Sequence, residues 1–469
     1  MLHLKSANEL RDLIAVREVS AREVLDAHLQ QVERVNGAVN AIVTLDTERA
    51  TQWSLEADEH QASGGELGVL HGLPIVHKDL FSTAGMRTTF GSPIYKDHVP
   101  DADELIIERL RGAGAISIGK SNTPEFGAGS QTFNDVFGAT RNPYDLEKTC
   151  GGSSGGAAVA LATRMVPIAD GSDMGGSLRN PASFCNVVGF RPSTGRVPTW
   201  PSDNAWFSFG VQGPMARTVK DVSLMLAAIA GPDQRVPLSI TEPSDQFLGS
   251  LDIDLRGKRI AFAPTLGGLP VCREVVKVNE KQRRTFAELG CEVVDACLDF
   301  ARADDVFKTL RAFRFAMKYG GLVEQHRELM KETVLWNISE GKKLSGEDIA
   351  KAQRWRTELF SRAVDFFEQF DFLVGPVTQV AAFNIEDQFV SEIEGVELTT
   401  YIDWMQSCYL VTATGMPAIS VPAGFTTDGL PVGLQLIGGY RRDLDVLKIA
   451  NAFELATNFS AQAPNLALA

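Results

Sequence analysis

Segments with the pattern of a helix alternate with short apolar runs along most of this chain, and this alternation limits the fold more than any other feature of the sequence. Two amphipathic helices are expected within residues 6–36, with Ser6 and Ser20 as caps and Glu23 completing a capping box with Ser20. Strands are expected at 41–46, 71–80 and 115–120, with a helix at 103–114. Such alternation predicts an α/β fold, in which helices cover the faces of a mostly buried sheet.

The second half of the chain continues the pattern. A strand–helix–strand unit is expected over 258–296, mostly helical structure over 303–370, and late strands at 370–377, 418–425 and 431–439. We find no internal repeat and no low-complexity linker. We therefore predict a single domain over residues 1–469, with a helical, cap-like region around 300–370.

Charge and composition argue against several classes of partner. The formal net charge is −14, whereas proteins that bind nucleic acids usually present a basic face to the phosphates. The first residues lack the basic head and apolar run of a secretory signal, and no run of 18 apolar residues occurs. These observations predict a cytoplasmic protein that binds neither nucleic acid nor membrane.

Cysteine and histidine spacing gives no sign of a metal site. None of the six cysteines forms a C-x-x-C pair, so we expect reduced and mostly buried thiols. The seven histidines lack H-x-H and H-E-x-x-H spacing. We predict that the chain holds no metal.

One stretch fits the phosphate-binding pattern G-x-x-x-x-G-K-[ST], namely "GAISIGKS" at Gly114–Ser121. That mechanism requires a strand, a glycine-rich loop and then a helix whose N-terminus holds the phosphates. Here the central residues fit a strand, a helix precedes them, and a proline turn follows. Nucleotide binding at this stretch is therefore not expected.

A glycine-serine loop, "CGGSSGG" at Cys150–Gly156, raises the question of catalysis. The residues that follow it favour a helix, which argues against a flexible linker, and a second glycine pair, Gly175-Gly176, directly precedes Ser177. Glycines allow close approach of a substrate and leave N–H groups free to stabilise an oxyanion.

A serine nucleophile needs a base, and the sequence offers two kinds. No histidine lies between His98 and His326, although a distant histidine can still fold into a site. Lys78 ends an apolar strand, so burial could keep its amine neutral. Taken singly, Lys78 also fits a surface lysine, Ser153 a loop serine and Ser177 a helix cap.

The combination of motifs resembles the amidase signature family. The motifs are "LPIVHKDL", "CGGSSGG" and "GSDMGGSLRNPASFCNVVGFRPSTGRVP", in the family's order and with its spacing between Ser153 and Ser177. Similar segments extend over nearly the whole chain, with the weakest likeness at 235–400. The resemblance implies the fold of that family, a large mixed β-sheet core covered by helices on both faces.

The resemblance also implies roles for individual residues. Ser177 is the implied acyl-forming nucleophile, Ser153 the bridging serine held by a cis peptide bond, and Lys78 the base. The implied oxyanion hole consists of backbone N–H groups, those of Met174, Gly175, Gly176 and Ser177. The remaining matched residues have supporting roles that hold the loops, and they are Ser154, Asp173 and Arg179.

Some positions depart from the family's pattern. His77 stands where an apolar residue is more common, and strand alternation points its side chain away from that of Lys78, so we interpret it as structural. Asp170 and Asn180 are also less usual in the family. Glu125 and Gln435 match family positions, but the sequence assigns them no chemistry.

The resemblance implies an amide hydrolase without a cofactor, acting on a small-molecule amide with an apolar or aryl group. Alternatives are the amidase-like subunit of a tRNA-dependent amidotransferase, an esterase or carbamate hydrolase, and an inactive binding protein; a homodimer is left open. Aromatic residues are expected either in the substrate pocket or in the core, and they include Phe313, Phe315, Trp336 and Trp404.

Overall fold

Strands from both halves of the chain join one sheet in the computed structural model, which describes residues 1–468. The 11-stranded sheet has the order β1-β3-β2-β8-β10-β9-β16-β17-β13-β11-β12. Its strands are β1 (Ile42–Leu45), β2 (Pro74–Lys78), β3 (Ile116–Ser121), β8 (Ile168–Asp173), β9 (Val188–Arg191), β10 (Val211–Ala216), β11 (Arg259–Phe262), β12 (Glu292–Asp295), β13 (Phe372–Pro376), β16 (Ala418–Phe425) and β17 (Pro431–Gly438). Parallel pairs such as β2–β3 and antiparallel pairs such as β8–β10 occur together, which confirms the expected mixed sheet.

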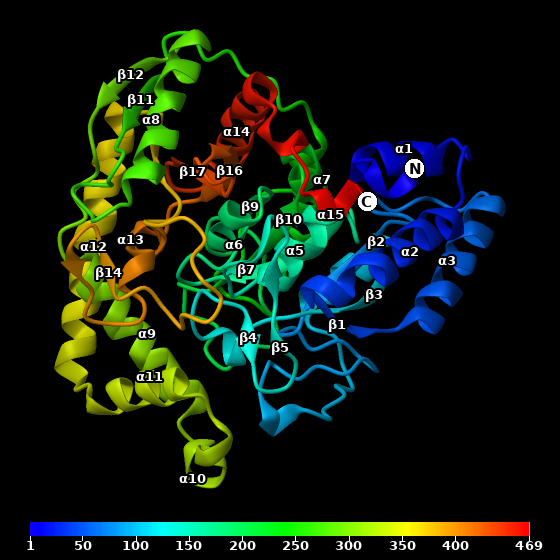
Figure 1. Cartoon of the computed structure of the whole chain (residues 1–469), viewed down its shortest axis with the longest axis horizontal. Helices are drawn as coiled ribbons and strands as arrows, with labels where there is room; N and C mark the ends of the chain where they lie inside the picture. The colour runs from blue at the N-terminus through cyan, green and yellow to red at the C-terminus, as the bar shows by residue number, and fades with distance from the viewer. Residues whose placement is uncertain (469) are drawn as a thin grey trace.

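Helices cover this sheet on both faces (Figure 1). The α-helices are α1 (Ala7–Ala15), α2 (Ala21–Val39), α3 (Thr47–Ala62), α4 (Leu105–Gly112), α5 (Gly155–Ala162), α6 (Arg179–Phe184), α7 (Val219–Ile229), α8 (Arg273–Glu288), α9 (Ala303–Tyr319), α10 (Val323–His326), α11 (Glu332–Lys343), α12 (Gly346–Gln369), α13 (Gln406–Thr414), α14 (Asp443–Thr457) and α15 (Asn465–Leu468). Short 3₁₀ helices lie at Leu2–Leu4, Pro93–Tyr95, Glu125–Gly127, Asp245–Leu248, Arg327–Leu329, Asp403–Met405 and Phe459–Ala461. Short strand pairs lie outside the sheet, namely β4 (Phe133–Asn134) with β5 (Gly138–Ala139), β6 (Arg141–Asn142) with β7 (Asp145–Thr149), and β14 (Glu392–Ile393) with β15 (Val396–Glu397).

Local sequence signals predict many of these elements correctly. Ser6 and Ser20 each form a capping box, with Glu9 and Glu23 respectively. β11, α8 and β12 form the expected strand–helix–strand unit, and its two strands pair in parallel. None of the helices within residues 1–468 is long and apolar enough to cross a membrane.

The stretch that fits the phosphate-binding pattern forms a strand, as its central residues predict. β3 includes Lys120, whose buried ammonium donates hydrogen bonds to the Phe81 carbonyl and to Thr83 Oγ1. No α-helix follows at once, because the described chain turns at Pro124 into the 3₁₀ helix Glu125–Gly127. Lys120, the lysine of the pattern, therefore stabilises the loop that follows β2.

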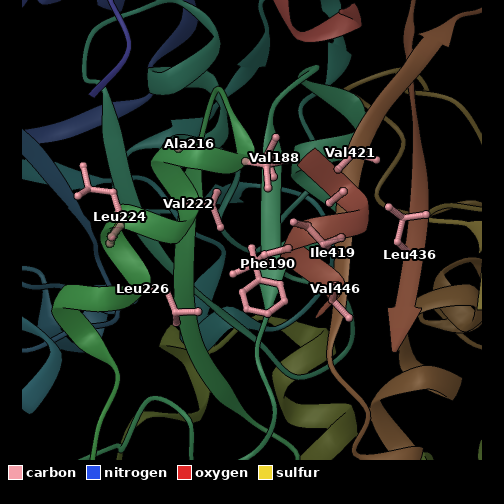
Figure 2. Close-up of a cluster of buried hydrophobic side chains, with 14 of the residues drawn as sticks. Val188, Phe190, Ala216, Val222, Leu224, Leu226, Ile419, Val421, Leu436 and Val446 are labelled. Atoms are coloured by element: carbon pink, nitrogen blue, oxygen red, sulfur yellow. The ribbon is translucent and has the colours of Figure 1, made fainter. Parts of the chain in front are cut away.

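The core contains two large apolar clusters, one on each face of the sheet, and two smaller clusters. Alternate residues of a strand enter different clusters: in β2, Ile75 joins the first and Val76 the second. In the first cluster, side chains of β9, β16 and β17 meet those of α7 and α14, as Figure 2 shows for Val188, Phe190, Val222, Leu224, Leu226, Ile419, Val421, Leu436 and Val446. In the second cluster, α5 and α6 pack on the opposite face. This two-sided burial explains why apolar residues occur on both faces of central strands such as β2, β8 and β10.

The two ends of the sheet carry different parts of the chain (Figure 1). β11, β12 and α8 form one end, and the N-terminal helices α2 and α3 lie at the other end beside β1 and β3. Helices α9, α10, α11 and α12 occupy the region where the sequence predicts mostly helical structure. α9 packs against α11, α12 and α13, which brings it to the side of the sheet that carries α5 and α6.

Candidate active site

Lys78 is the last residue of β2, and its side chain is fully buried at 0% exposure. Its Nζ lies 2.7 Å from Ser153 Oγ, 2.9 Å from Ser154 Oγ and 3.1 Å from Ser172 Oγ. The apolar strand predicted from the sequence therefore leads this lysine into the protein interior, where hydroxyl groups surround the amine.

The pKa of Lys78 is lowered to about 7 because burial disfavours its charged form, although Asp173 and Asp170 partly oppose this by favouring it. Near neutral pH a large fraction of the amines is therefore uncharged. A neutral amine can donate two hydrogen bonds and accept a third through its lone pair. The shortest contact, with Ser153 Oγ at 2.7 Å, has the geometry for the hydroxyl to donate to the amine.

Ser153 and Ser154 lie in the loop between β7 and α5, and Ser154 is the N-cap of α5. The peptide bond between Gly152 and Ser153 is cis. The backbone N–H of Ser154 donates a hydrogen bond of 3.2 Å to the carbonyl of Ser177. This bond joins the glycine-serine loop directly to the second motif, as their order in the sequence could not show.

Ser177 lies between β8 and α6 and is half-buried. The preceding Gly176 has a φ of +114°, which L side chains rarely adopt, and a Cβ there would approach Cys408 Cβ to 2.6 Å. Glycine is therefore required at 176 by both backbone conformation and space. The turn that it makes brings Ser177 to the wall of a cavity.

Asp173 holds this turn in place through hydrogen bonds. Its carboxylate accepts hydrogen bonds from the N–H of Gly176 (3.0 Å) and of Leu178 (3.2 Å). Arg179 lies 2.9 Å and Arg191 3.3 Å from Asp173 Oδ1, and all three side chains are buried. Burial alone would raise the pKa of Asp173, but the two guanidinium groups hold that pKa well below its ordinary value.

Arg179 also ties the turn to distant elements. Its guanidinium donates hydrogen bonds to Gln435 Oε1 (2.6 Å), the Cys408 carbonyl (3.1 Å) and Thr412 Oγ1 (3.0 Å). Gln435, to which the sequence assigns no chemistry, thus serves as an acceptor for this arginine. Glu125, the other such residue, accepts hydrogen bonds from Ser92 Oγ and the Lys331 N–H, each at 2.6 Å.

We expect Arg179→Met to lower the free energy of unfolding by about 3–5 kcal/mol, since it leaves a buried carboxylate and several acceptors without their partner. Urea unfolding followed by circular dichroism measures this change. Arg256→Met is the matched control, because Arg256 forms an exposed ion pair with Asp254 and its loss should leave the unfolding midpoint unchanged. Equal midpoints for the two variants would contradict the supporting role of Arg179.

The segment before Ser177 carries the N–H groups that the resemblance assigns to an oxyanion hole. The Gly176 N–H donates to Asp173, so it already has an acceptor. Met174 and Gly175 lie directly after β8, where Gly175 packs against Phe307 and Met174 lines the cavity. The role of these three N–H groups, and of the Ser177 N–H that the resemblance adds to them, stays a prediction.

A cavity of about 850 Å³ opens beside these residues. Its walls include Ser153, Ser172 and Ser177, so the hydroxyl nearest the lysine and the serine of the second motif face one space. The aromatic rings of the wall are Phe81, Phe90, Tyr95, Phe126, Phe207, Phe315 and Tyr319. The polar side chains of the wall include Glu104, Gln212, Arg311 and Arg314.

The expected pocket aromatics divide between the cavity and the core. Phe315 lines the cavity, whereas Trp404 is 1% exposed and packs between Phe184 and Phe383. Phe313 and Trp336 are not among the described residues of the cavity wall. Most of the aromatic wall comes instead from residues 81–126 and from Phe207, because the loops after β2 and before β10 fold over the site. Phe81 directly follows the motif that ends in Leu80, and Phe126 follows the matched Glu125, whereas Phe207 lies in a loop without a motif.

Comparison with known proteins identifies the chain's relatives. A family model described as Amidase matches residues 23–447. The chain is 36% identical over 466 residues to an acylamidase of Rhodococcus erythropolis, an alignment that covers 99% of this chain and 98% of the relative. It is also 36% identical over 486 residues to the glutamyl-tRNA(Gln) amidotransferase A subunit of Geobacillus thermodenitrificans, covering 98% of this chain and 99% of the relative.

Solved structures agree with these matches. A bacterial aryl acylamidase of the amidase signature family superposes with a TM-score of 0.92 at 31% identity, covering 99% of both chains. A 6-aminohexanoate cyclic dimer hydrolase superposes with a TM-score of 0.90 at 25% identity and the same coverage. The chain therefore belongs to the amidase signature family and is an enzyme that hydrolyses carbon–nitrogen bonds in amides other than peptides.

Proposed function

We propose that this enzyme hydrolyses a small carboxylic amide with an apolar or aryl group, through an acyl-enzyme on Ser177. In this proposal Ser153 relays protons and Lys78 is the base. One observation carries the proposal: the amine of Lys78 lies 2.7 Å from Ser153 Oγ, and Ser153 and Ser177 line the same cavity.

The first half-reaction begins with the neutral amine of Lys78. It accepts the proton of Ser153, which in turn accepts the proton of Ser177, and Ser177 Oγ attacks the amide carbonyl. We assign the stabilisation of the negative oxygen that forms to the backbone N–H groups of Met174, Gly175 and Ser177, since the Gly176 N–H already donates to Asp173.

The carbon–nitrogen bond then breaks. The proton returns from Lys78 through Ser153 to the leaving amine, and the acyl group stays on Ser177. In the second half-reaction a water molecule gives its proton to the same relay and attacks the acyl carbonyl. Ser177 leaves with a proton, and the carboxylic acid is released.

Ser154, Asp173 and Arg179 support this chemistry without taking part in bond changes. Ser154 Oγ lies 2.9 Å from the amine of Lys78, and the Ser154 N–H holds the carbonyl of Ser177. Asp173 and Arg179 fix the turn that carries the proposed oxyanion donors. No step requires a cofactor or a metal ion.

The substrate class follows from the cavity walls and from the relatives. Aromatic rings such as those of Phe126 and Phe315 favour a flat or apolar group beside the scissile amide. The acylamidase and aryl acylamidase relatives favour the same class. We propose that the chain acts alone on such amides, although the amidotransferase relatives of equal identity favour glutamine as the second candidate substrate.

A substrate panel with the purified chain separates these candidates. The panel contains an anilide, an aliphatic amide, glutamine, a phenyl ester and an aryl carbamate. We expect kcat/KM for the anilide to exceed that for glutamine by about a hundredfold or more, because glutamine has no apolar group to bury against the aromatic wall. Turnover of glutamine but of no other compound in the panel would favour the amidotransferase alternative. A kcat/KM higher for the ester or the carbamate than for every amide would favour the esterase or carbamate hydrolase alternative.

The pH dependence of kcat/KM should show the pKa of the group that acts as the base. Because the reaction needs the neutral amine of Lys78, whose pKa is about 7, kcat/KM should rise from low pH through neutrality and level off above it. At one pH unit below that pKa, about a tenth of the plateau value should remain. Initial rates with a neutral anilide, measured between about pH 5 and pH 10, test this. A profile that is flat down to the acid end would show that another group is the base.

A further inference from the structure

A buried network of polar side chains lies behind the proposed base. His77 Nδ1 lies 2.5 Å from Asp170 Oδ2, and His77 Nε2 lies 2.7 Å from Ser117 Oγ. The second oxygen of Asp170 accepts the backbone N–H of Lys78 at 2.6 Å. All of these side chains are buried, and they come from the three adjacent strands β2, β3 and β8.

The side chain of His77 points away from that of Lys78, as strand alternation predicts. Ile75, two residues earlier, belongs to one core cluster and Val76 to the other, so His77 and Lys78 leave opposite faces of the sheet. Asp170 therefore holds the end of β2 from the face opposite the serines. Two of the three residues in this network, His77 and Asp170, are positions where the chain departs from the family's pattern.

Every polar atom of the network has a partner when Asp170 is a carboxylate. With its ring proton on Nδ1, His77 donates to Asp170, and the Ser117 hydroxyl donates to His77 Nε2. A fully satisfied network is what permits polar groups to be buried without a large cost. Each carboxylate oxygen of Asp170 thus has one hydrogen-bond partner, the Lys78 N–H or His77 Nδ1.

We propose that His77 and Asp170 are positioning residues that hold the main chain of Lys78 and place a fixed negative charge near its amine. This inference rests on the proposed role of Lys78 as the base. Without that charge, only Asp173 would oppose the effect of burial, so the pKa of Lys78 would fall further and the enzyme would work at lower pH. Without the hydrogen bond from its N–H to Asp170, Lys78 would also lose its alignment.

Other charged groups surround Lys78 and Asp170, and they are Asp79 after β2, Lys120 on β3, Asp173 on β8, Arg179 on α6 and Arg191 on β9. The negative charge of Asp173 is offset by two arginines, whereas the side-chain ion-pair partner of Asp170 is His77. Removing the charge of Asp170 should therefore lower the pKa of the Lys78 amine.

Asp170→Asn tests the charge while keeping the shape. Asn Oδ1 can still accept the Lys78 N–H, and its amide can donate to His77 Nδ1 if the ring proton moves to Nε2. We expect the acid limb of kcat/KM to move to lower pH by about one unit, with a plateau reduced by up to about tenfold. Ser117→Ala is the matched control, since it shortens the network without changing its charge, and its acid limb should stay in place.

A second pair of variants tests the positioning role if Asp170→Asn fails to fold. His77→Leu removes the side-chain partner that holds the Asp170 carboxylate, so the main chain of Lys78 should be held less firmly and the plateau of kcat/KM should fall. His77→Asn can retain a donor at the Nδ1 position and should restore the wild-type plateau. An acid limb that stays in place in Asp170→Asn, or a wild-type plateau in His77→Leu, would overturn the inference. Full activity of Ser177→Ala would instead overturn the proposed function on which it rests.

Discussion

Ser177→Ala should lower kcat for every amide that the enzyme hydrolyses by about a thousandfold or more, because the acyl group then has no oxygen to which it can bind. The substitution removes a single half-buried hydroxyl next to Gly176, so folding should be unaffected. Steady-state kinetics with the best anilide of the panel, beside a thermal unfolding curve, measures both effects.

Ser202→Ala provides the matched control for this result. Ser202 lines the same cavity but lies outside both glycine-serine motifs, so its loss should change kcat by less than about threefold. A Ser177→Ala variant that retains more than about a tenth of wild-type turnover would contradict the assignment of the nucleophile.

Lys78→Met should lower kcat/KM by roughly three orders of magnitude, since methionine fills much of the same buried space without a group that accepts a proton. The remaining activity should also lose its rise around pH 7, because the group responsible for that rise has been removed. The complete pH profile of the variant therefore says more than its rate at one pH.

The matched control for Lys78→Met is Lys120→Met. Lys120 is equally buried on the neighbouring strand, and its ammonium contacts Phe81 and Thr83 rather than the serines. Both variants should lose stability, but Lys120→Met should keep the acid limb of the wild-type profile. If instead Lys78→Met kept that acid limb, Lys78 would not be the base.

Much of the fold could be predicted from local sequence patterns. The caps at Ser6 and Ser20, the strand ending at Lys78 and the parallel unit β11–α8–β12 all follow from residues close together in the chain. The order of the sheet does not, because β13 joins β11 on one side and β17 on the other. Such long-range pairing depends on which apolar faces match in three dimensions, which local patterns do not record.

The candidate site, like the fold, could be predicted from the sequence only in part. The resemblance placed Lys78, Ser153 and Ser177 in one site, and the structure places Lys78 beside Ser153 and puts both serines on one cavity. The partners of His77 could not be predicted, since Ser117 and Asp170 are 40 and 93 residues away. The aromatic wall was missed for a similar reason, because Phe207 reaches the cavity from a loop with no motif, and Phe126 follows a matched position to which the sequence assigns no chemistry.

Labelling with a fluorophosphonate tests the central claim, that Ser177 is the activated nucleophile, most directly. Trypsin separates the two motifs, since Ser153 and Ser154 fall in the peptide 149–164 and Ser177 in the peptide 165–179. The account predicts one adduct, located by fragmentation at Ser177, that forms much more slowly in Lys78→Met. An adduct in the peptide 149–164, or none on the active enzyme, would contradict it.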